Sequence, residues 1–487
     1  MRNFLRVVGL FVCVWLSYTL GALQESRRAE RNLFEGVRNV VQRYYVDPVD
    51  ADSLVIAGVH GVIDHLHDPY TEIMDPRRFM HFREDAEGKF GGIGTQIQVR
   101  SEGLTIVSPH PDQPAARAGI RAGDRVVAVD GKPTEGWNSE DAVAALRGEP
   151  GSDVTLTVRR GDDTLNIRIR RDTIRVSAVS AAAILEDGIG YVALDMFSAN
   201  ATTDLRVAID SLIKEGARAL VLDLRSNPGG LLEQALAIAN LFLPQGVLLA
   251  EVRGRDERLN RQLWSMEQPR YPDLPLALVV NGATASAAEI VAGALRDHHR
   301  ARIFGTRTFG KGSIQTLFPL PQDYVMRLTT ARWFTPSGDS FNNERNTRGG
   351  IVPDVIVTEP LWSTVDRMLR ERDLGWEMLA EYVYAAATAV AEGKATPREA
   401  ARMVAETLEI MPAEEGPFLD LIEQQIELES TVMRDGSRAA RILEAKKSAS
   451  VQTAVESLRC LLATKDPASP AGRHECQPYS SPDRVAS

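Results

Sequence analysis

The stretch NGATASAAEIVAGAL, residues 281–295, follows the apolar run LALVV (276–280) and contains one serine. An apolar run, a turn of small residues and a second apolar run at helical spacing predict a strand, a turn and a helix that begins near Ser286. Ser286 and Glu289 fit the S-x-x-E pattern of a capping box, so the serine could serve only as a cap. The alternative is that Ser286 is a nucleophile.

A second strand–turn–helix unit lies earlier in the sequence. The run ALVLDL (219–224) predicts a buried strand, and SNPGG turns it into the helix LLEQALAIANLFL. Both turns then lie at the carboxyl ends of strands, where α/β sheets place their sites. The glycines form either a plain turn or an oxyanion hole, in which the N–H of Gly229 or Gly230 would act with that of Ala287. Residues 175–358 are therefore predicted to form an α/β core.

A nucleophilic serine needs an adjacent base, and histidine or lysine can provide it. None of the eight histidines lies in a pattern typical of a serine–histidine pair. Lys311 lies between two glycines in TRTFGKGSIQ, and it is one of only eight lysines among 56 basic residues. Arginine does not deprotonate in proteins, whereas burial can lower the pKa of a lysine from about 10.4 toward neutrality. Lys311 is thus either a surface lysine in a loop or the base for Ser286.

Bulk composition excludes some classes of function. The chain has 487 residues, 44% hydrophobic and 25% charged, with a formal net charge of -10, as in an ordinary multidomain globular protein. It has no block rich in lysine and arginine, so a nucleic-acid partner is not expected. No cysteine–histidine cluster has metal-binding spacing, and hydrolysis by a serine and a lysine needs neither a metal nor another cofactor.

The N-terminus is typical of an exported protein. Arg2 and Arg6 precede an apolar stretch, residues 7–23, and charged residues follow it. We interpret residues 1–25 as a cleaved signal peptide or a membrane anchor, with a buried helix of a soluble protein as the alternative. In an oxidising compartment, Cys460 and Cys476 could form a disulfide.

The remaining sequence falls into segments of different character. Residues 26–87 show helical periodicity, and residues 88–174 contain short β-type runs that predict a small β-rich domain. Residues 359–464 are helical again, whereas residues 465–487 are rich in serine and proline and predict a disordered tail.

Five motifs together resemble one protein family. They are HDPYT (67–71), DLRSNPGG (223–230), NGATASAAEIVAGALRD (281–297), GTRTFGKGSIQ (305–315) and RGGIVPDVIV (348–357). In this order and spacing they resemble the carboxyl-terminal processing, or tail-specific, proteases, a Ser/Lys peptidase family, over about residues 35–358. The resemblance implies a multidomain α/β (α+β) fold: an α/β catalytic core with an inserted PDZ domain, an N-terminal helical segment and a C-terminal helical extension.

The resemblance assigns roles to residues of the core. It implies that Ser286 is the nucleophile, Lys311 the general base and Gln315 the residue that positions the lysine. Asp297 matches a third relay member, but it lies eleven residues along the helix from Ser286, or about 16 Å at 1.5 Å per residue, too far for a direct role. The family usually has a second serine at the position of Ala288.

Residues 88–174 in turn resemble a PDZ domain. FGGIGTQI (90–97) would be its carboxylate-binding loop, and a peptide would add as a strand beside residues 94–98. The predicted peptide-binding residues are Gly91, Gly92, Ile93, Gly94, Ala142, Val143 and Leu146. The alternative is a structural β domain without a ligand.

The resemblance therefore implies an exported serine endopeptidase of the periplasm or cell envelope that cleaves the C-terminal tails of periplasmic or membrane proteins. It leaves open an adaptor lipoprotein, a homo-oligomer and membrane association through the N-terminus. Two other classes are a catalytically silent PDZ scaffold that binds C-termini and a histidine-dependent PDZ protease of trypsin type. A silent scaffold should lack Ser286 or Lys311, and both are present. A trypsin-type protease needs two β-barrels, and the sequence of residues 175–358 does not predict them.

Overall fold

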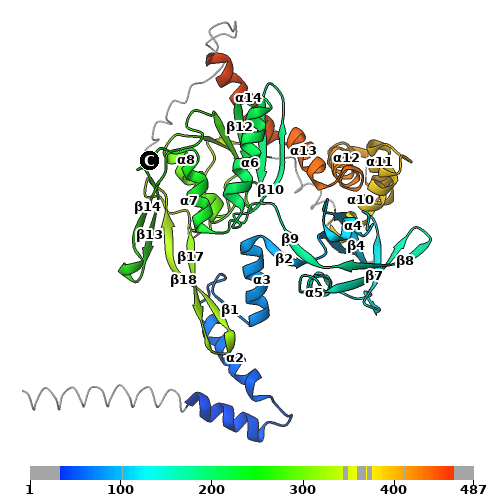
Figure 1. The fold of residues 1–487 in the computed structure, drawn as a ribbon, viewed down its shortest axis with the longest axis vertical. Helices are drawn as coiled ribbons and strands as arrows, with labels where there is room; N and C mark the ends of the chain where they lie inside the picture. Colours follow the sequence, from blue (N-terminus) through cyan, green and yellow to red (C-terminus); the bar gives the residue numbers. More distant parts are fainter. Residues whose placement is uncertain are drawn as a thin grey trace, which may run out of the picture. The chain divides into compact units, whose positions relative to one another are not determined.

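The computed structural model describes residues 33–100, 103–343, 349–358, 369, 376–410 and 412–465. They fall into two compact units (Figure 1). One comprises the described residues up to Pro76 together with Gln315–Thr329. The other comprises the described residues of 77–314 and those from Thr330 onward.

The smaller unit is a helical segment followed by paired strands. Residues 33–44 are helical, and α2 (Ala51–Asp64) begins where the Asp50 carboxylate accepts the N–H of Ser53 at 2.9 Å. Strand β1 (Glu72–Met74) pairs antiparallel with residues 325–327, the start of β18 (Val325–Phe334). The segment predicted as helical, 26–87, therefore also contains a strand, because HDPYT breaks the helical pattern with a proline.

The larger unit is organised around one six-stranded sheet. In sheet order its strands are β10 (Val179–Ile184), β11 (Ile189–Leu194), β12 (Ala219–Asp223), β15 (Leu276–Val280), β16 (Arg302–Gly305) and β19 (Val355–Ile356). Only β10 runs antiparallel to its neighbour. One face of the sheet packs against α6 (Ala201–Lys214), α7 (Leu232–Asn240) and α8 (Ala287–Asp297), as Figure 1 shows.

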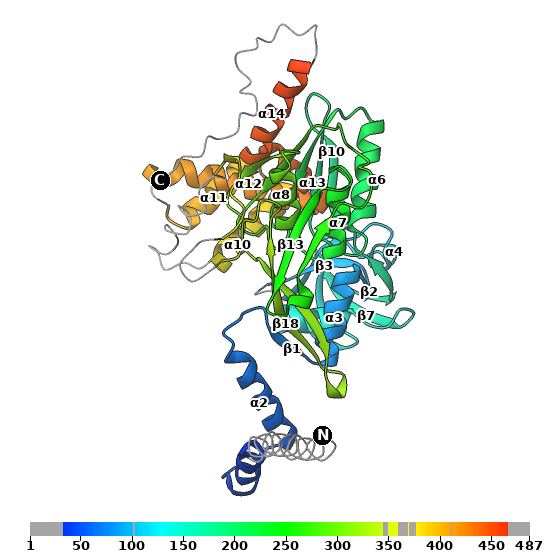
Figure 2. The ribbon, with the colours of Figure 1, turned by 90° about the vertical axis from the view of Figure 1, so that its left-hand side faces the viewer.

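The opposite face of this sheet is covered by the C-terminal helices α13 (Ser437–Lys447) and α14 (Ala449–Lys465), which can be followed in Figure 2. Val455 and Leu458 of α14 are buried with Val221 and Val279 of the central strands. Because both faces are covered, the central parallel strands are mostly apolar, with charged residues only near strand ends, such as Asp223 of β12 and Arg302 of β16. The last two helices of the predicted extension therefore complete the α/β core.

A second sheet extends the core. Strand β13 (Leu248–Gly254) pairs antiparallel with β14 (Arg261–Trp264) on one side. On its other side it pairs with residues 331–334, the end of β18. Strand β17 (Ser313–Pro319), which follows Lys311, also pairs with β18.

The β-rich domain is inserted into this unit between two short paired strands, β2 (Lys89–Gly92) and β9 (Asp172–Arg175). Its own sheet has the order β3 (Thr95–Arg100), β4 (Gly103–Pro109), β5 (Arg125–Val129), β7 (Asp153–Arg160) and β8 (Asp163–Arg170), and β6 (Lys132–Pro133) pairs with β5. Two helices, α4 (Pro114–Arg117) and α5 (Ser139–Leu146), complete the domain. The predicted architecture, an α/β core with an inserted β-rich domain and helical segments at both ends, is confirmed.

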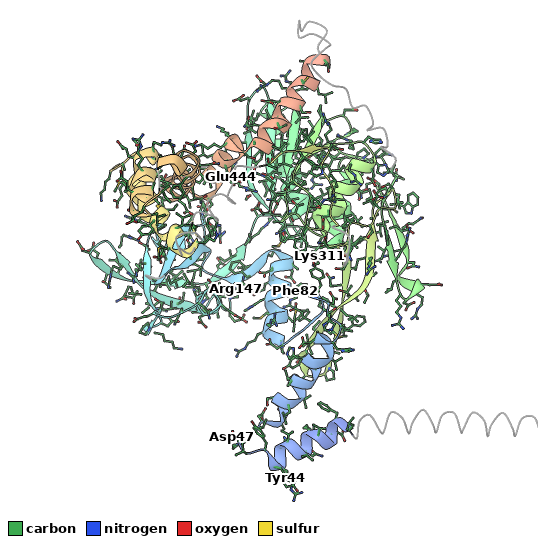
Figure 3. All side chains as sticks on the ribbon, turned by 180° about the vertical axis from the view of Figure 1, so that it is seen from behind. Tyr44, Asp47, Phe82, Arg147, Lys311 and Glu444 are labelled. Carbon is green, nitrogen blue, oxygen red and sulfur yellow. The ribbon has the colours of Figure 1, made fainter. Side chains whose placement is uncertain are left out.

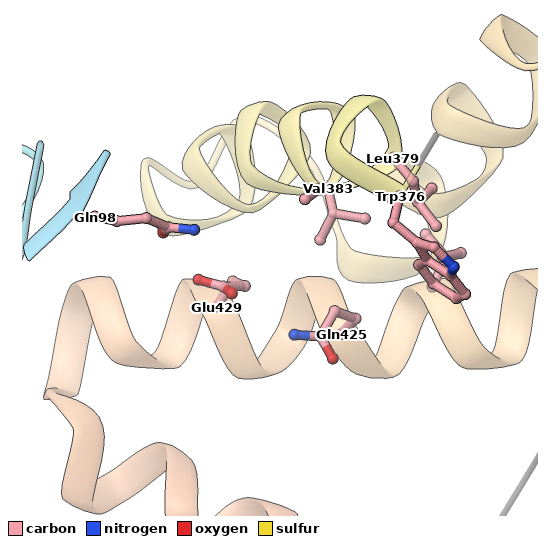
Figure 4. A pocket seen from close by; sticks show the side chains of 8 residues that line it. Gln98, Trp376, Leu379, Val383, Gln425 and Glu429 are labelled. Atoms are coloured by element: carbon pink, nitrogen blue, oxygen red, sulfur yellow. The ribbon is translucent and has the colours of Figure 1, made fainter. Parts of the chain in front are cut away.

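Helices α10 (Trp376–Ala391), α11 (Pro397–Thr407) and α12 (Pro412–Asp435) pack into a separate small core. Between α10 and α12 lies a cavity of about 340 Å³, lined by Trp376, Val383 and Ile422 among others. Gln98 of β3 closes one end of it (Figure 4). The apolar walls of this cavity belong to the helical extension, whereas the predicted catalytic site lies at the carboxyl ends of the parallel strands.

Substitutions in α14 test whether this helix is part of the core. Leu458 is 3% exposed and Leu461, on the same helix, is 41% exposed. We expect Leu458→Ala to lower the free energy of unfolding by about 2–5 kcal/mol, because it leaves a cavity under the sheet. Leu461→Ala, the matched control, should change it by less than about 0.5 kcal/mol. Urea unfolding measures both, and equal losses would contradict the role of α14.

Candidate active site

The two predicted turns are tied to each other at the carboxyl ends of β12 and β15. These strands are parallel neighbours, so their following turns begin at the same edge of the sheet. The N–H of Ser226 donates to Oδ1 of Asn281 at 2.9 Å. The N–H of Ala285 donates to the carbonyl oxygen of Asn227, also at 2.9 Å. The structure therefore brings the SNPGG turn directly against the turn that contains Ser286.

Ser286 stands at the start of α8 in a strained backbone conformation. Its φ is 56° and its ψ is -118°, a region that residues with a side chain rarely adopt. Gly229, with φ of 100°, lies so close that a Cβ atom there would be 2.7 Å from Cβ of Ser286. Such strain costs on the order of 1–3 kcal/mol and persists only where the surroundings fix the backbone.

Glu289 provides this constraint. Its side chain is fully buried, and its carboxylate accepts four hydrogen bonds. Oε2 accepts the N–H groups of Ser286 and Lys311, both at 2.9 Å, and Oε1 accepts the Gly310 N–H at 2.8 Å and the Thr308 hydroxyl at 2.5 Å. Because Ser286 and Lys311 share one acceptor atom, their backbone nitrogens are at most twice 2.9 Å, or 5.8 Å, apart.

The protonation of Glu289 reflects two opposed effects. Burial raises the pKa of its carboxyl above the ordinary value, whereas the four donors stabilise the ionised form and reduce the shift. The sequence predicted a capping box, and the carboxylate does accept the N–H of Ser286. The second task of Glu289, holding the Lys311 segment, was missed. An acidic residue in the otherwise apolar run AAEIVAGAL was the available signal.

The segment around Lys311 is held on its other side as well. Asn343 donates its amide to the carbonyl oxygen of Phe309 at 2.6 Å, and its N–H donates to that of Gly310 at 2.9 Å. A Cβ atom at Gly310 would lie 2.9 Å from the Asn343 side chain, so glycine is needed for this close approach. Lys311 itself is half-buried (Figure 3). The loop therefore presents the lysine from a fixed backbone.

The structure favours one of the two glycines, Gly229 and Gly230, that were predicted to donate to an oxyanion. The N–H of Gly229 donates to Oδ1 of Asn227 at 2.9 Å, so it is already occupied. The N–H groups of Gly230 and Ala287 have no acceptor among the described residues. The N atom of Ala287 lies 2.9 Å from the position that a Gly229 Cβ would take. Of the two candidate glycines, the geometry therefore favours Gly230 as the partner of Ala287.

Two other predicted residues lie elsewhere. Asp297 is at the opposite end of α8 from Ser286, where it accepts the N–H and the hydroxyl of Ser337 at 2.9 and 2.7 Å. Burial raises the pKa of its carboxyl, but the Ser337 hydrogen bonds and Arg296 outweigh burial and lower it overall. Gln315 belongs to the smaller unit, where its amide donates to the hydroxyl of Thr329 at 3.3 Å. Its predicted role beside the lysine stays a prediction.

The predicted peptide-binding residues are placed only in part as expected. Gly91 and Gly92 lie in β2 opposite residues of β9, and Ile93 and Gly94 follow as the approach to β3. Ala142 and Leu146 are 0% and 5% exposed and belong to the core of the β-rich domain. The inner face of α5 packs on the sheet, and the predicted contact of these two residues with a peptide stays a prediction. Val143 is half-buried and remains available.

Metal ligands and membrane-spanning helices are both absent from the described part of the chain. The described residues contain no group of three or more histidine, cysteine, aspartate or glutamate side chains arranged to hold a metal ion. None of their helices combines the length and the hydropathy that crossing a membrane requires. The predicted anchor, residues 7–23, and the predicted tail from 466 onward lie outside them.

Comparisons with known proteins identify relatives of this chain. Residues 188–357 match peptidase family S41, and residues 105–160 match a PDZ domain. The chain is 39% identical to a carboxy-terminal-processing protease of Bartonella bacilliformis over 340 residues, which cover 68% of this chain and 74% of that protein. It is 32% identical to a probable CtpA-like serine protease of Staphylococcus epidermidis over 362 residues, 74% of this chain and 72% of that one. Among solved structures, this chain is 30% identical to a photosystem II D1 C-terminal processing protease. The match covers 68% of this chain and 93% of that one, with a TM-score of 0.40.

The strain at Ser286 predicts that its glycine variant is more stable than its alanine variant, the reverse of what is usual within a helix. Ser286→Ala keeps the strained conformation, whereas Ser286→Gly relieves it, so we expect the glycine variant to be more stable by about 1 kcal/mol. Exposed Ser211 in the last turn of α6 is the control, where the backbone is helical and glycine should be less stable than alanine by about 0.5–1 kcal/mol. Urea unfolding of the four variants gives both differences. The same order at both positions would show that Ser286 is not strained.

Proposed function

Because this chain belongs to peptidase family S41 and is a serine peptidase with a PDZ domain, we propose that it cleaves C-terminal tails of exported proteins through Ser286 and Lys311. One observation carries this assignment. A single carboxylate oxygen of Glu289 accepts the backbone N–H groups of both residues, so the nucleophile and the base are fixed to a common point.

The proposed reaction follows from this arrangement. Neutral Lys311 takes the proton of the Ser286 hydroxyl as its oxygen attacks a peptide carbonyl. The N–H groups of Ala287 and Gly230 stabilise the tetrahedral oxyanion. Lys311 then gives the proton to the leaving amine, and an acyl-enzyme remains on Ser286. A water molecule, with Lys311 again as the base, attacks the ester and restores the serine.

The PDZ domain supplies the recognition of the tail in this proposal. An extended peptide would add as a strand beside residues 94–98 and form main-chain hydrogen bonds with β3. The terminal carboxylate would bind backbone N–H groups of the segment from Gly91 to Ile93. Half-buried Val143 on α5 would contact a side chain of the peptide. The natural substrate is then any protein whose unfolded C-terminus can reach both this strand and Ser286.

We further propose that the protein works in the periplasm or cell envelope, anchored by residues 7–23 or released by cleavage after them. Cys460 on α14 is disulfide-bonded, which supports an oxidising compartment. Cys476, the predicted partner, lies outside the described residues. An adaptor lipoprotein and a second copy of the chain are further partners that we propose to test by co-purification from membranes.

The alternatives fit less well. A trypsin-type protease needs two β-barrels, whereas this core is a mainly parallel sheet between helices. A silent PDZ scaffold has no use for a buried carboxylate that joins a strained serine to a lysine. A Ser/Lys peptidase needs its serine and its lysine close together, and the shared acceptor supports this by holding their backbones near each other.

Cleavage of an unstructured peptide with an apolar C-terminus tests the proposal. The full chain should cleave it, whereas Ser286→Ala and Lys311→Arg should each lower kcat by at least about a thousandfold, since arginine stays charged. The same peptide with an amidated C-terminus should show a raised KM and little change in kcat. Mass spectrometry identifies the products. Wild-type activity in Lys311→Arg would exclude the dyad, and binding without cleavage by any form would favour the scaffold.

A further inference from the structure

A closed ring of four charged side chains joins the C-terminal helix α13 to the turn after β12. Arg225 Nη2 lies 2.7 Å from Asp223 Oδ2 and 3.4 Å from Glu444 Oε1. Arg441 Nη1 lies 2.7 Å from Glu444 Oε2, and its Nη2 lies 3.7 Å from Asp223 Oδ2. Two residues of the ring therefore come from the DLRSNPGG motif and two from α13, on which Figure 3 labels Glu444. Two positive and two negative charges balance.

The ring is buried on its core side. Asp223 is 0% exposed and Arg225 is 7% exposed, and the Tyr191 hydroxyl donates to Asp223 Oδ2 at 2.7 Å. Burial raises the pKa of the Asp223 carboxyl, but the charges of Arg225 and Arg441 outweigh burial and hold the pKa below its ordinary value. A buried carboxylate is tolerated only with such partners, and removing one partner leaves an uncompensated charge. Arg225 thus contacts Glu444 of α13 directly and is linked to Arg441 through the Asp223 carboxylate.

Arg225 begins the turn that supplies the oxyanion donor. Its own N–H donates to Asp223 Oδ1 at 2.9 Å, so both its backbone and its side chain are fixed by that carboxylate. Two residues further on, the Asn227 amide donates to the Leu194 carbonyl oxygen at 2.7 Å and its Oδ1 accepts the Gly229 N–H at 2.9 Å. Gly230 follows directly. A shift of Arg225 therefore moves the turn that places the Gly230 N–H.

We propose that Arg441 and Glu444 are positioning residues for this oxyanion turn, so that helix α13 is part of the catalytic unit. The proposal rests on the proposed roles of Ser286 and Gly230. Oxyanion donors act on the transition state and not on the bound ground state. Loss of the ring therefore lowers kcat and leaves KM for the peptide unchanged. An α13 that only covered the sheet would instead affect stability alone.

The test uses the full chain with Arg441→Met, which removes one charge of the ring. Arg459→Met is the matched control. Arg459 lies on the neighbouring helix α14 and pairs with Glu186 and Asp187. These two residues precede the start of β11, so they lie at the end of the sheet opposite to the turn after β12. We expect at least a tenfold lower kcat and a KM within about twofold for Arg441→Met. Arg459→Met should leave both constants unchanged. Arg441→Lys, which keeps the charge, should recover part of the loss.

A second readout does not depend on activity. Amide hydrogen exchange of residues 224–227 and of Gly229, whose N–H groups are all hydrogen-bonded, should be at least tenfold faster in Arg441→Met than in the wild type, and unchanged in Arg459→Met. If Arg441→Met does not fold, the charge-balanced pair Arg441→Met with Glu444→Gln takes its place in both measurements. Unchanged exchange, or a kcat no lower than that of the control, would overturn the proposal. Absence of cleavage by the wild type would refute the Ser286 assignment instead, and the exchange result would still decide the role of α13.

Discussion

One buried carboxylate, that of Glu289, fixes the geometry on which the rest of the site depends. It holds the backbone of Ser286 at one end of α8 and the backbone of Lys311 in a separate loop. A carboxylate removed from water is costly unless it is fully hydrogen-bonded, and here four donors surround it. The need to satisfy this charge thus forces two distant segments of sequence together.

The same region stores strain that other contacts must balance. Ser286 has a positive φ, and Gly229 leaves just enough space beside it. On the far side of the turn, Asp223 and Arg225 are held by Arg441 and Glu444 of α13. The turn that we propose as the oxyanion site is therefore fixed from both directions, by the helix that begins at Ser286 and by the C-terminal helices. A site that must stabilise a transition state benefits from such rigidity, because its donors then need no reorganisation during the reaction.

The sequence predicted the α/β core, the inserted β-rich domain and the pairing of the two turns, because strand–turn–helix patterns and glycine-rich motifs are local signals. The sequence did not show which of Gly229 and Gly230 has an N–H group available for an oxyanion, since this depends on the Asn227 side chain, which accepts the Gly229 N–H. The resemblance assigned Ala142 and Leu146 to a peptide pocket, whereas their place in the core of the β-rich domain depends on the packing of α5, which is not a local signal. The sequence likewise predicted that residues 359–464 are helical, without indicating that α13 and α14 would cover the second face of the sheet.

The most direct test of this account is the kcat of Glu289→Gln, measured beside its thermal unfolding. Glutamine has the same shape, but its NH2 group cannot accept hydrogen bonds, so in either orientation at least one backbone N–H now bonded to Glu289 loses its acceptor, at a cost of about 1–3 kcal/mol for each unsatisfied group. We expect a folded protein whose kcat is at least about a hundredfold lower, because the anchor shared by Ser286 and the Lys311 segment is weakened. A kcat within about twofold of the wild-type value would contradict it.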